Sequence, residues 1–590
     1  MGGHAARGSP PGGPVTDTDV LIVGAGPVGL TAAAELRRQR VACRVIDRLP
    51  GRLPYAKAVG IQPRTLEVWD RMGLVRAALE AAVPMRGQLL YVDGAEQGRI
   101  DLRLPPEVPY GFAALPQYET ERILEEHLAR FGTRIERGAE LVSFAQDADG
   151  VVSRITTADG GDEEVRSLFL VGCDGAHSTV RKGLGLSFEG GAFPEEYMLG
   201  DVEVDWSLPP GYGVRSLHHG ADGAVDDVLV CIPLPGRHRY RMSMLVPPGL
   251  SAAGSGGDGG GADGVAHGLE TGRGPGLEDI QAVLDRLAPE PVTASALRWS
   301  SVFRISHRLV DRYGDGRVFV AGDAAHIHPP TGAQGMNTGI QDAHNLAWKL
   351  ALAVAGRAHP RLLESYHAER HPVGEEVVGR TVRHARQGAA SDAEDAGTAL
   401  LREAQLLVAY PGSPLVGPRG GNGAGPGPGE RAPDCGGLTS RGASVPLRLF
   451  DLLRDRGHVL VLYAESAADL AACGELAALA RRSAGAGGGA DGSGPQACVV
   501  LAAPDPSGDG AGQDRHGAAV DAAYEGPASG AAPLPVFVDG RGEFARAYGT
   551  GGATAFVVRP DGYLGVRLAP VAGPETAAGL AAHFARVFAG

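Results

Sequence analysis

Three glycines near the N-terminus have the spacing of a phosphate-binding loop. Gly24, Gly26 and Gly29 follow an apolar stretch typical of a buried strand and open a segment with helical character. Gly24 permits a tight turn, Gly26 lets the backbone approach a diphosphate, and Gly29 allows the helix to pack closely on a sheet. Pro27 and Val28 complete the loop. Backbone N–H groups at the start of the helix would bind the negative charge of a phosphate.

An acidic residue follows this loop at the distance expected for a nucleotide site. A second apolar strand, residues 41–46, ends at Asp47, eighteen residues past Gly29. A carboxylate in this position accepts hydrogen bonds from ribose hydroxyls. The order of strand, glycine loop, helix, strand and acid predicts a dinucleotide-binding unit. The alternative is a glycine-rich turn that serves only helix packing.

A second candidate site lies in the sequence GRVFVAGDAAHIHPPTGAQGMNTGIQDAHNLAWKLA, residues 316–351. A predicted strand at 318–320 runs into Gly322 and Asp323, and a carboxylate at a strand end can accept hydrogen bonds from a hydroxylated chain. Pro330 belongs to a stiff Pro-Gly loop, and the small residues after it let a flat ring lie against the backbone.

An amphipathic helix is predicted directly after this loop, because apolar residues recur at its helical period. Its first residues are Gly335, Met336 and Asn337. Backbone N–H groups at this end of a helix would stabilise negative charge on a reduced ring. His326 and His328 could suggest a metal site, but no third ligand lies nearby in the sequence. Packing or hydrogen bonding within the loop is the interpretation we favour, so no metal is expected.

These motifs are joined by a third, SLFLVGCDGAHSTVRKGLG, in which a strand ends before Asp174. Taken in order, the three motifs resemble the flavoprotein monooxygenases of the para-hydroxybenzoate hydroxylase class. The resemblance covers residues 19 to about 380. It implies an α/β fold: a Rossmann-type FAD-binding domain, an antiparallel-sheet substrate domain and, in members with a C-terminal extension, a thioredoxin-like domain.

The resemblance also implies roles for single residues. Arg48 would lie beside the AMP half of FAD, and the backbone near Pro330 would lie at the flavin edge where oxygen adds. Gln117 matches a glutamine near the flavin, or else is a solvated loop residue. Asp174 matches a residue linked to FAD and nicotinamide binding, or else holds a strand-to-loop turn. Lys57 stands where the family usually has arginine, and a lysine supplies charge without a bidentate fork.

The implied reaction needs FAD, with NADPH or NADH as a transient co-substrate, and O2. NAD(P)H reduces the flavin, oxygen adds as a C4a-hydroperoxide, and one oxygen atom is transferred to an electron-rich ring. We expect a large polycyclic aromatic substrate of polyketide type. No side-chain base is expected, because phenols are activated by their own hydroxyls. The alternatives are a Baeyer–Villiger oxygenase on the same scaffold, a protein that only binds a drug in a flavin pocket, and an NAD-dependent dehydrogenase.

The domain organisation follows from composition and motif positions. A leader spans residues 1–17, and the FAD-binding domain is expected at 18–185 and 296–410. A substrate-binding sheet is expected at 186–295, with a flexible Gly/Ser/Asp-rich insertion at 251–276. The remaining segments are a Gly/Pro linker at 411–430 and a thioredoxin-like domain at 431–590. The sequence GERAPD, at the junction of the linker and that domain, and the sequence RPDGY within the domain match the extension of phenol and polyketide hydroxylases.

Composition limits the partners and the compartment that can be expected for the protein. The net charge of −14 argues against nucleic acid and anionic membrane surfaces as partners. The six cysteines form no C-x-x-C pair, which excludes thiol–disulfide exchange of the thioredoxin type and fits a reducing compartment. No apolar run is long enough to cross a bilayer. A cytoplasmic location is expected, with a homodimer as one candidate assembly.

Overall fold

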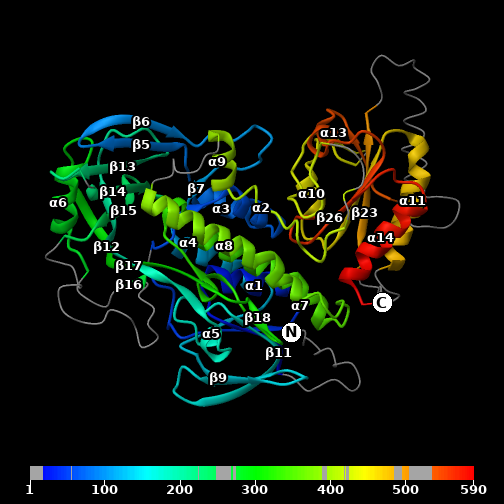
Figure 1. The fold of residues 1–590 in the computed structure, drawn as a ribbon, viewed down its shortest axis with the longest axis horizontal. Helices are drawn as coiled ribbons and strands as arrows, with labels where there is room; N and C mark the ends of the chain where they lie inside the picture. Colours follow the sequence, from blue (N-terminus) through cyan, green and yellow to red (C-terminus); the bar gives the residue numbers. More distant parts are fainter. Residues whose placement is uncertain are drawn as a thin grey trace.

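The computed structural model describes residues 17–54, 56–223, 225–247, 268–269, 274–387, 395–417, 419, 424–440, 442–483, 494–503 and 534–589. The predicted leader, except for Asp17, and most of the predicted insertion at 251–276 lie outside these residues, as does part of the linker at 411–430. In the described part of the chain, the strands form three large sheets and one small one. Figure 1 shows them as three neighbouring regions, with the C-terminal region in yellow to red on one side.

The first large sheet is built on the predicted glycine-loop unit. Its strand order is β18-β19-β11-β1-β2-β8, and β1, β2, β8, β11 and β19 run parallel. The central strand β1 is apolar from Val20 to Val23 and almost wholly buried, as expected for a strand that is covered on both faces. Strands β9 and β10 extend β11 as an antiparallel ribbon. The strands are β1 (Thr18–Val23), β2 (Cys43–Asp47), β8 (Ile135–Arg137), β9 (Glu140–Gln146), β10 (Val151–Thr156), β11 (Asp162–Gly172), β18 (Gly314–Asp315) and β19 (Val318–Val320).

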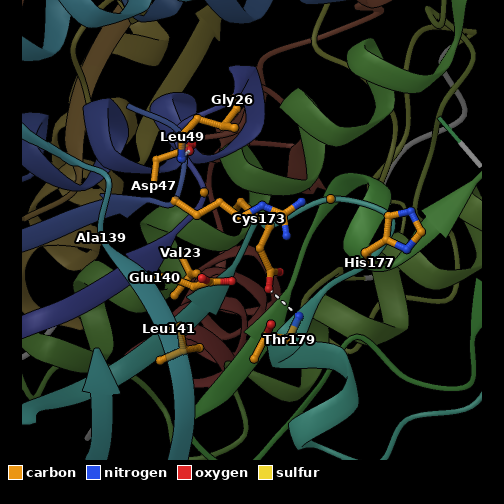
Figure 2. A pocket seen from close by; sticks show the side chains of 14 residues that line it. Val23, Gly26, Asp47, Leu49, Ala139, Glu140, Leu141, Cys173, His177 and Thr179 are labelled. Carbon is orange, nitrogen blue, oxygen red and sulfur yellow. Dashed lines mark hydrogen bonds between the residues drawn. The ribbon is translucent and has the colours of Figure 1, made fainter. Parts of the chain in front are cut away.

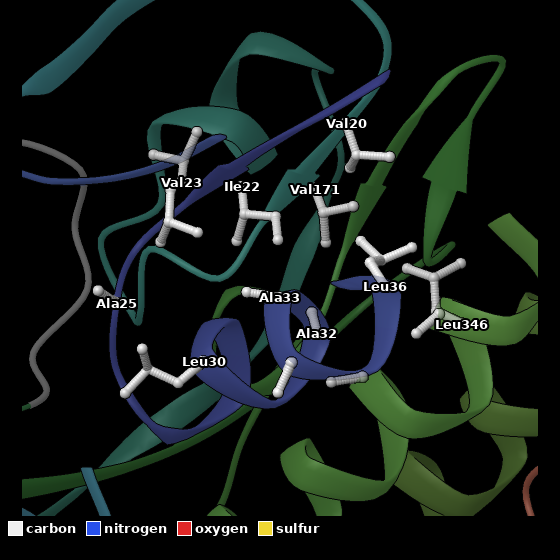
Figure 3. Packing of buried hydrophobic residues seen from close by; sticks show 14 of the residues in the cluster. Val20, Ile22, Val23, Ala25, Leu30, Ala32, Ala33, Leu36, Val171 and Leu346 are labelled. Carbon is white, nitrogen blue, oxygen red and sulfur yellow. The ribbon is translucent and has the colours of Figure 1, made fainter. Parts of the chain in front are cut away.

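Two helices from distant parts of the chain pack on this sheet side by side. Helix α1 (Pro27–Arg38) follows the glycine loop, and α7 (Gly335–Val354) follows the second candidate site. Figure 3 shows Ile22 of β1 and Val171 of β11 above Ala33 of α1, with Leu346 of α7 beside them. This shared core brings the two predicted motifs to the same edge of the sheet.

The second large sheet has nine strands in the order β16-β17-β12-β15-β14-β13-β5-β6, with β20 beside β17. Its main pairs are antiparallel. The sheet extends beyond the range 186–295 expected for it, because β5, β6 and most of β17 lie outside that range. The strands are β5 (Gly87–Val92), β6 (Ala95–Asp101), β12 (Phe188–Val204), β13 (Tyr212–His219), β14 (Val225–Pro233), β15 (Arg239–Leu245), β16 (Gly268–Leu269), β17 (Ala294–Val310) and β20 (His326–Ile327).

The third large sheet lies in the C-terminal region and has the order β21-β24-β23-β22-β25-β26. Strands β22, β23 and β24 are parallel, and β25 and β26 are antiparallel additions. The elements are β21 (Leu438–Thr439), α10 (Leu449–Leu453), β22 (Val459–Ala464), α11 (Leu470–Ser483), β23 (Gln496–Ala502), β24 (Val536–Asp539), α13 (Glu543–Tyr548), β25 (Thr554–Val558), β26 (Leu564–Leu568) and α14 (Pro574–Val587).

Further helices and a small sheet connect these layers. Helix α6 packs its apolar stripe on one face of the nine-stranded sheet. The elements are β3 (Gly60–Ile61), α2 (Pro63–Arg71), α3 (Val75–Ala81), β4 (Val83–Pro84), β7 (Ala113–Ala114), α4 (Gln117–Ala129), α5 (Thr179–Gly183), α6 (Leu277–Leu287), α8 (Glu364–Gln387) and α9 (Ala396–Glu403). Among the described residues, no helix is both long enough and apolar enough to span a bilayer.

Candidate flavin and substrate site

The glycine loop has the geometry that its residue types predict. Gly24 has a φ of +101°, and a Cβ at this residue would lie 2.3 Å from the carbonyl oxygen of Cys173. A Cβ at Gly29 would lie 1.9 Å from the carbonyl oxygen of Gly24. In contrast, a Cβ at Gly26 would meet nothing within 4 Å. The first two glycines are therefore required by the protein itself, whereas Gly26 leaves open space at the start of α1.

The open space belongs to a cavity of about 210 Å³ at the edge of the first sheet. Figure 2 shows Gly26, Asp47 and Cys173 around it. Asp47 also stabilises the loop, since its Oδ2 accepts a hydrogen bond from the backbone N–H of Ala25 at 2.7 Å. The exposed Arg48 lines the same cavity. The cavity thus joins the predicted phosphate loop to the predicted ribose acid.

Asp174 also lines this cavity, but its carboxylate is used within the protein. Oδ1 accepts a hydrogen bond from the Ser178 hydroxyl at 2.5 Å, and Oδ2 accepts from the backbone N–H groups of Thr179 and Val180 at 2.7 and 3.2 Å. Burial raises the pKa of Asp174 despite these bonds. These contacts are those of a residue that stabilises the turn from the end of β11 into α5.

The second candidate site lies directly against the glycine loop. Gly322 has a φ of +62°, and a Cβ there would lie 2.8 Å from Cγ2 of Val28. Its backbone N–H donates to Oδ2 of Asp342 at 3.2 Å. Half-buried Asp323 follows at the end of β19. The two predicted motifs therefore lie side by side, as one shared ligand requires.

The rings of the two histidines in the second motif stack with centroids 6.1 Å apart, but the two side chains have different hydrogen-bond partners. His326 Nε2 lies 2.7 Å from Oδ2 of Asp342, whose Oδ1 accepts from Arg370 at 2.7 Å. His328 Nδ1 donates to the carbonyl oxygen of Pro329 at 3.1 Å. Burial and the neighbouring His326 lower the pKa of His328 to about 4, so it is neutral at pH 7. Within the described ranges, no group of three or more His, Cys, Asp or Glu side chains is arranged to hold a metal ion.

The start of α7 is tied to the segment 60–62. Asn337 Oδ1 accepts from the backbone N–H of Gln62 at 3.0 Å, and Asn337 Nδ2 donates to the carbonyl oxygen of Gly60 at 2.9 Å. Gln62 Nε2 in turn donates to the carbonyl oxygen of Gly332 at 2.5 Å. The Asn337 side chain thus fixes the segment 60–62 against the start of α7. The backbone N–H groups of Gly335 and Met336 precede Thr338, whose N–H makes the first hydrogen bond of the helix.

Pro330, Lys57 and Gln117 lie around this junction. Pro330 is exposed at the start of the loop that leads to α7. The Nζ of Lys57 lies 5.1 Å from the centroid of the Phe303 ring, which belongs to the nine-stranded sheet. Gln117 starts α4 and donates from its backbone to Ala58 at 2.9 Å. The segment around residue 58 therefore contacts both α4 and the nine-stranded sheet.

The residues present fit a flavin dinucleotide. The space at Gly26 and the start of α1 suit a diphosphate, and Asp47 retains lone pairs for a ribose. Asp323 and the start of α7 follow on the same sheet edge, where a ribityl chain and a flat ring would continue. Asp342 and Gln62, which organise this second part, were not identified from the sequence. The helical period placed Asp342 on α7, but no sequence signal showed that its side chain points toward Gly322.

This fold and site define the class of dinucleotide-binding proteins that carry a second, mainly antiparallel sheet. The family model described as an FAD binding domain matches residues 17–258 and 271–381, and the chain belongs to that family. A flavin-dependent monooxygenase of Mycobacteroides abscessus is 35% identical over 468 residues, which are 76% of this chain and 89% of that relative. The chain is accordingly a flavin-dependent monooxygenase.

Two further similarities concern proteins of Streptomyces rimosus. The 6-methylpretetramide 4-monooxygenase is 42% identical over 365 residues, which are 61% of this chain and 60% of that relative. The solved structure of the anhydrotetracycline hydroxylase OxyS has a TM-score of 0.66 at 26% identity and covers 97% of this chain and 99% of its own. The similarity to OxyS thus includes the C-terminal region.

Proposed function

We propose that this protein is an NAD(P)H-dependent monooxygenase that hydroxylates a polycyclic aromatic compound of polyketide type. The main support for the proposal is that one segment contacts both the start of α7 and the nine-stranded sheet. The segment 56–62 contacts the start of α7 through Asn337 and the nine-stranded sheet through Lys57 and Phe303. A ring bound between that sheet and the α7 loop would lie beside the flavin. The names of the relatives support a polyketide-type substrate.

Bound FAD would take hydride from NAD(P)H and activate O2, and the protein's own groups would bind, orient and exclude water. The loop of Gly24, Gly26 and Gly29 would bind the diphosphate, and Asp47 the ribose. Asp323 would accept a hydrogen bond from the ribityl chain. The positive end of α7 would stabilise negative charge on the reduced ring.

The resemblance of the sequence motifs to the family suggests further roles. Arg48 would lie beside the AMP half, and Gln117 beside the flavin. Pro330 would line the edge of the ring where oxygen reacts. Asp174 would act indirectly, since it holds the turn below the cavity.

We further propose that the C-terminal region is a thioredoxin-like domain with a structural role. The order β23-β22-β25-β26, with β22 and β23 parallel and the other two antiparallel, supports this. Its cysteines Cys435, Cys473 and Cys498 are buried, separate and unpaired. Together with the other three free cysteines they support a reducing compartment such as the cytoplasm. A homodimer is proposed as the assembly, which sedimentation analysis of the FAD-loaded protein would test.

The proposed reaction is tested with purified FAD-loaded protein and a panel of polycyclic phenols under isotopically labelled O2. We expect one or more phenols to stimulate NADPH or NADH oxidation and to gain one labelled hydroxyl oxygen. A labelled lactone or ester oxygen would instead indicate Baeyer–Villiger oxygenation. Tight binding of the panel without any oxidation of NAD(P)H would contradict catalysis.

A further inference from the structure

Arg241 is a buried cation for which the described residues provide no ion-pair partner. It lies on β15, and only 8% of the residue is exposed. Its Nε is buried without a hydrogen-bond partner, and no described residue forms an ion pair with the guanidinium. Arg239, two residues earlier on the strand, is different, because it binds both carboxylate oxygens of Asp201, with Nε at 2.7 Å from Oδ1.

A buried guanidinium without a partner destabilises the folded protein unless a bound ligand provides the missing hydrogen-bond acceptor. A guanidinium carries five N–H donors and remains charged at neutral pH. Buried polar groups are almost always hydrogen-bonded, and a buried unpaired charge strongly destabilises a fold. Burial lowers the pKa of Arg241 to about 10, and no carboxylate offsets this effect. A ligand oxyanion would supply the missing partner.

The register of the sheet places Arg241 on the face toward the flavin site. Side chains alternate along a strand, and the neighbouring residues Met242 and Met244 pack in the cluster that α6 covers. Arg241 therefore stands on the opposite face. Its cross-strand neighbour Ile232 packs against Ala56 and Val59. This face thus meets the segment that leads to Gln62 and α7.

The same face carries aromatic side chains and a second cation. In the strand register, Tyr197 pairs with both Leu245 and Phe303, so these residues share the face of Arg241. Lys57, in the segment that leads to Gln62, places its ammonium group over the Phe303 ring. A flat ring system with an anionic edge would suit both features. Asp201 lies directly opposite Arg241 in the strand register, but its two carboxylate oxygens are bound by Arg239.

We propose that Arg241 is the specificity-determining residue that binds an ionised phenol or enol oxygen of the polycyclic substrate. This inference rests on the proposed function. On binding, the substrate O–H bond breaks heterolytically, the proton passes to water, and the oxygen keeps the electron pair beside the guanidinium. An ionised oxygen donates more electron density to the ring than a neutral hydroxyl does. The site would in this way activate the ring without a side-chain base.

The test uses a probe, a dihydroxyanthraquinone with both hydroxyls beside one carbonyl, added to FAD-loaded full-length protein. We expect the bound probe to show the long-wavelength absorption band of its ionised form at a pH where the free probe is neutral. Arg241→Gln should remove this band and weaken binding by about tenfold or more. Arg241→Lys should restore part of the band. Anthraquinone without hydroxyls should bind wild type and Arg241→Gln equally well.

Arg298→Gln is the matched control, because Arg298 lies on the same sheet with a side chain that is 56% exposed. An unchanged band and affinity in folded Arg241→Gln would overturn the proposal. If that variant does not fold, the wild type alone decides: a bound probe that ionises no more readily than the free probe also overturns it. A probe that binds in ionised form but is never oxygenated would contradict the proposed function while leaving the role of Arg241 intact.

Discussion

Arg559 of the C-terminal region and Glu369 of α8 form a fully buried, two-point ion pair. Nη1 of Arg559 lies 2.6 Å from Oε1 of Glu369, and Nη2 lies 2.8 Å from Oε2. Glu369 also accepts from Lys349 of α7 at 2.7 Å. Burial opposes ionisation of Glu369, but Arg559 and Lys349 outweigh it and lower its pKa. The turn at residues 559–562 is thereby linked to helices α7 and α8.

Removal of the charge at Glu369 should strongly destabilise the protein. Glu369→Gln leaves two cations buried with less compensation, and we expect a loss of about 3–5 kcal/mol in the free energy of unfolding. Urea unfolding followed by far-UV circular dichroism measures this. Glu364→Gln on the same helix is the control, because the ion pair of Glu364 with Arg361 is largely exposed. It should change stability by less than about 0.5 kcal/mol. Equal effects of the two variants would contradict a structural role for the pair.

The three loop glycines should separate into two classes. Gly29→Ala should reduce both folding and FAD binding, because its Cβ would overlap the carbonyl of Gly24. Gly26→Ala has room for its Cβ, so the apoprotein should keep its thermal stability within about 0.5 kcal/mol while FAD binds more weakly. Thermal melts of the apoprotein and FAD titration distinguish the two effects. A Gly26→Ala protein that binds FAD with native affinity would show that the open space is not the diphosphate site.

Glu121 on α4 should make stability decrease between mildly acidic and neutral pH. Burial raises its pKa to about 7, although Gln117 donates to it at 2.9 Å. The folded state therefore keeps a proton that the unfolded state releases above the ordinary pKa of 4.5. Stability should fall as the pH rises from about 4.5 to about 7 and then level off.

Glu121→Gln should remove this effect while keeping the contact with Gln117. Its melting temperature relative to wild type should rise between pH 5 and pH 8, by an amount corresponding to about 1–3 kcal/mol. A constant difference across this range would mean that Glu121 is ionised in the folded protein throughout.

The sequence predicted those parts of the site that depend on local geometry. The need for glycine at residues 24 and 29 arises from steric limits within one strand-loop-helix unit, and a Cβ at either residue would overlap a carbonyl oxygen. The second motif, with Asp323, was recognisable for the same reason. These features need no knowledge of distant contacts.

Contacts between distant segments could not be predicted in this way. Strands β5 and β6 join the nine-stranded sheet from a part of the chain assigned to another domain, because pairing depends on the final position of the strands. Asn337 was expected to contribute its backbone, and the additional contacts of its side chain with Gly60 and Gln62 could not be foreseen. Arg241 was not singled out from the sequence, because only the packed structure shows that the Nε of this buried residue has no hydrogen-bond partner among the described residues.

Equilibrium FAD binding by Asp323→Ala tests most directly whether the two motifs hold one FAD. Asp323 lies next to the glycine loop only because two distant motifs fold together, and a lost hydrogen bond to the cofactor should weaken FAD binding by about tenfold or more. Asp315→Ala, an exposed change nearby on β18, serves as the control and should bind FAD like the wild type. Full flavin content and unchanged affinity in Asp323→Ala would contradict the claim that both motifs hold one FAD.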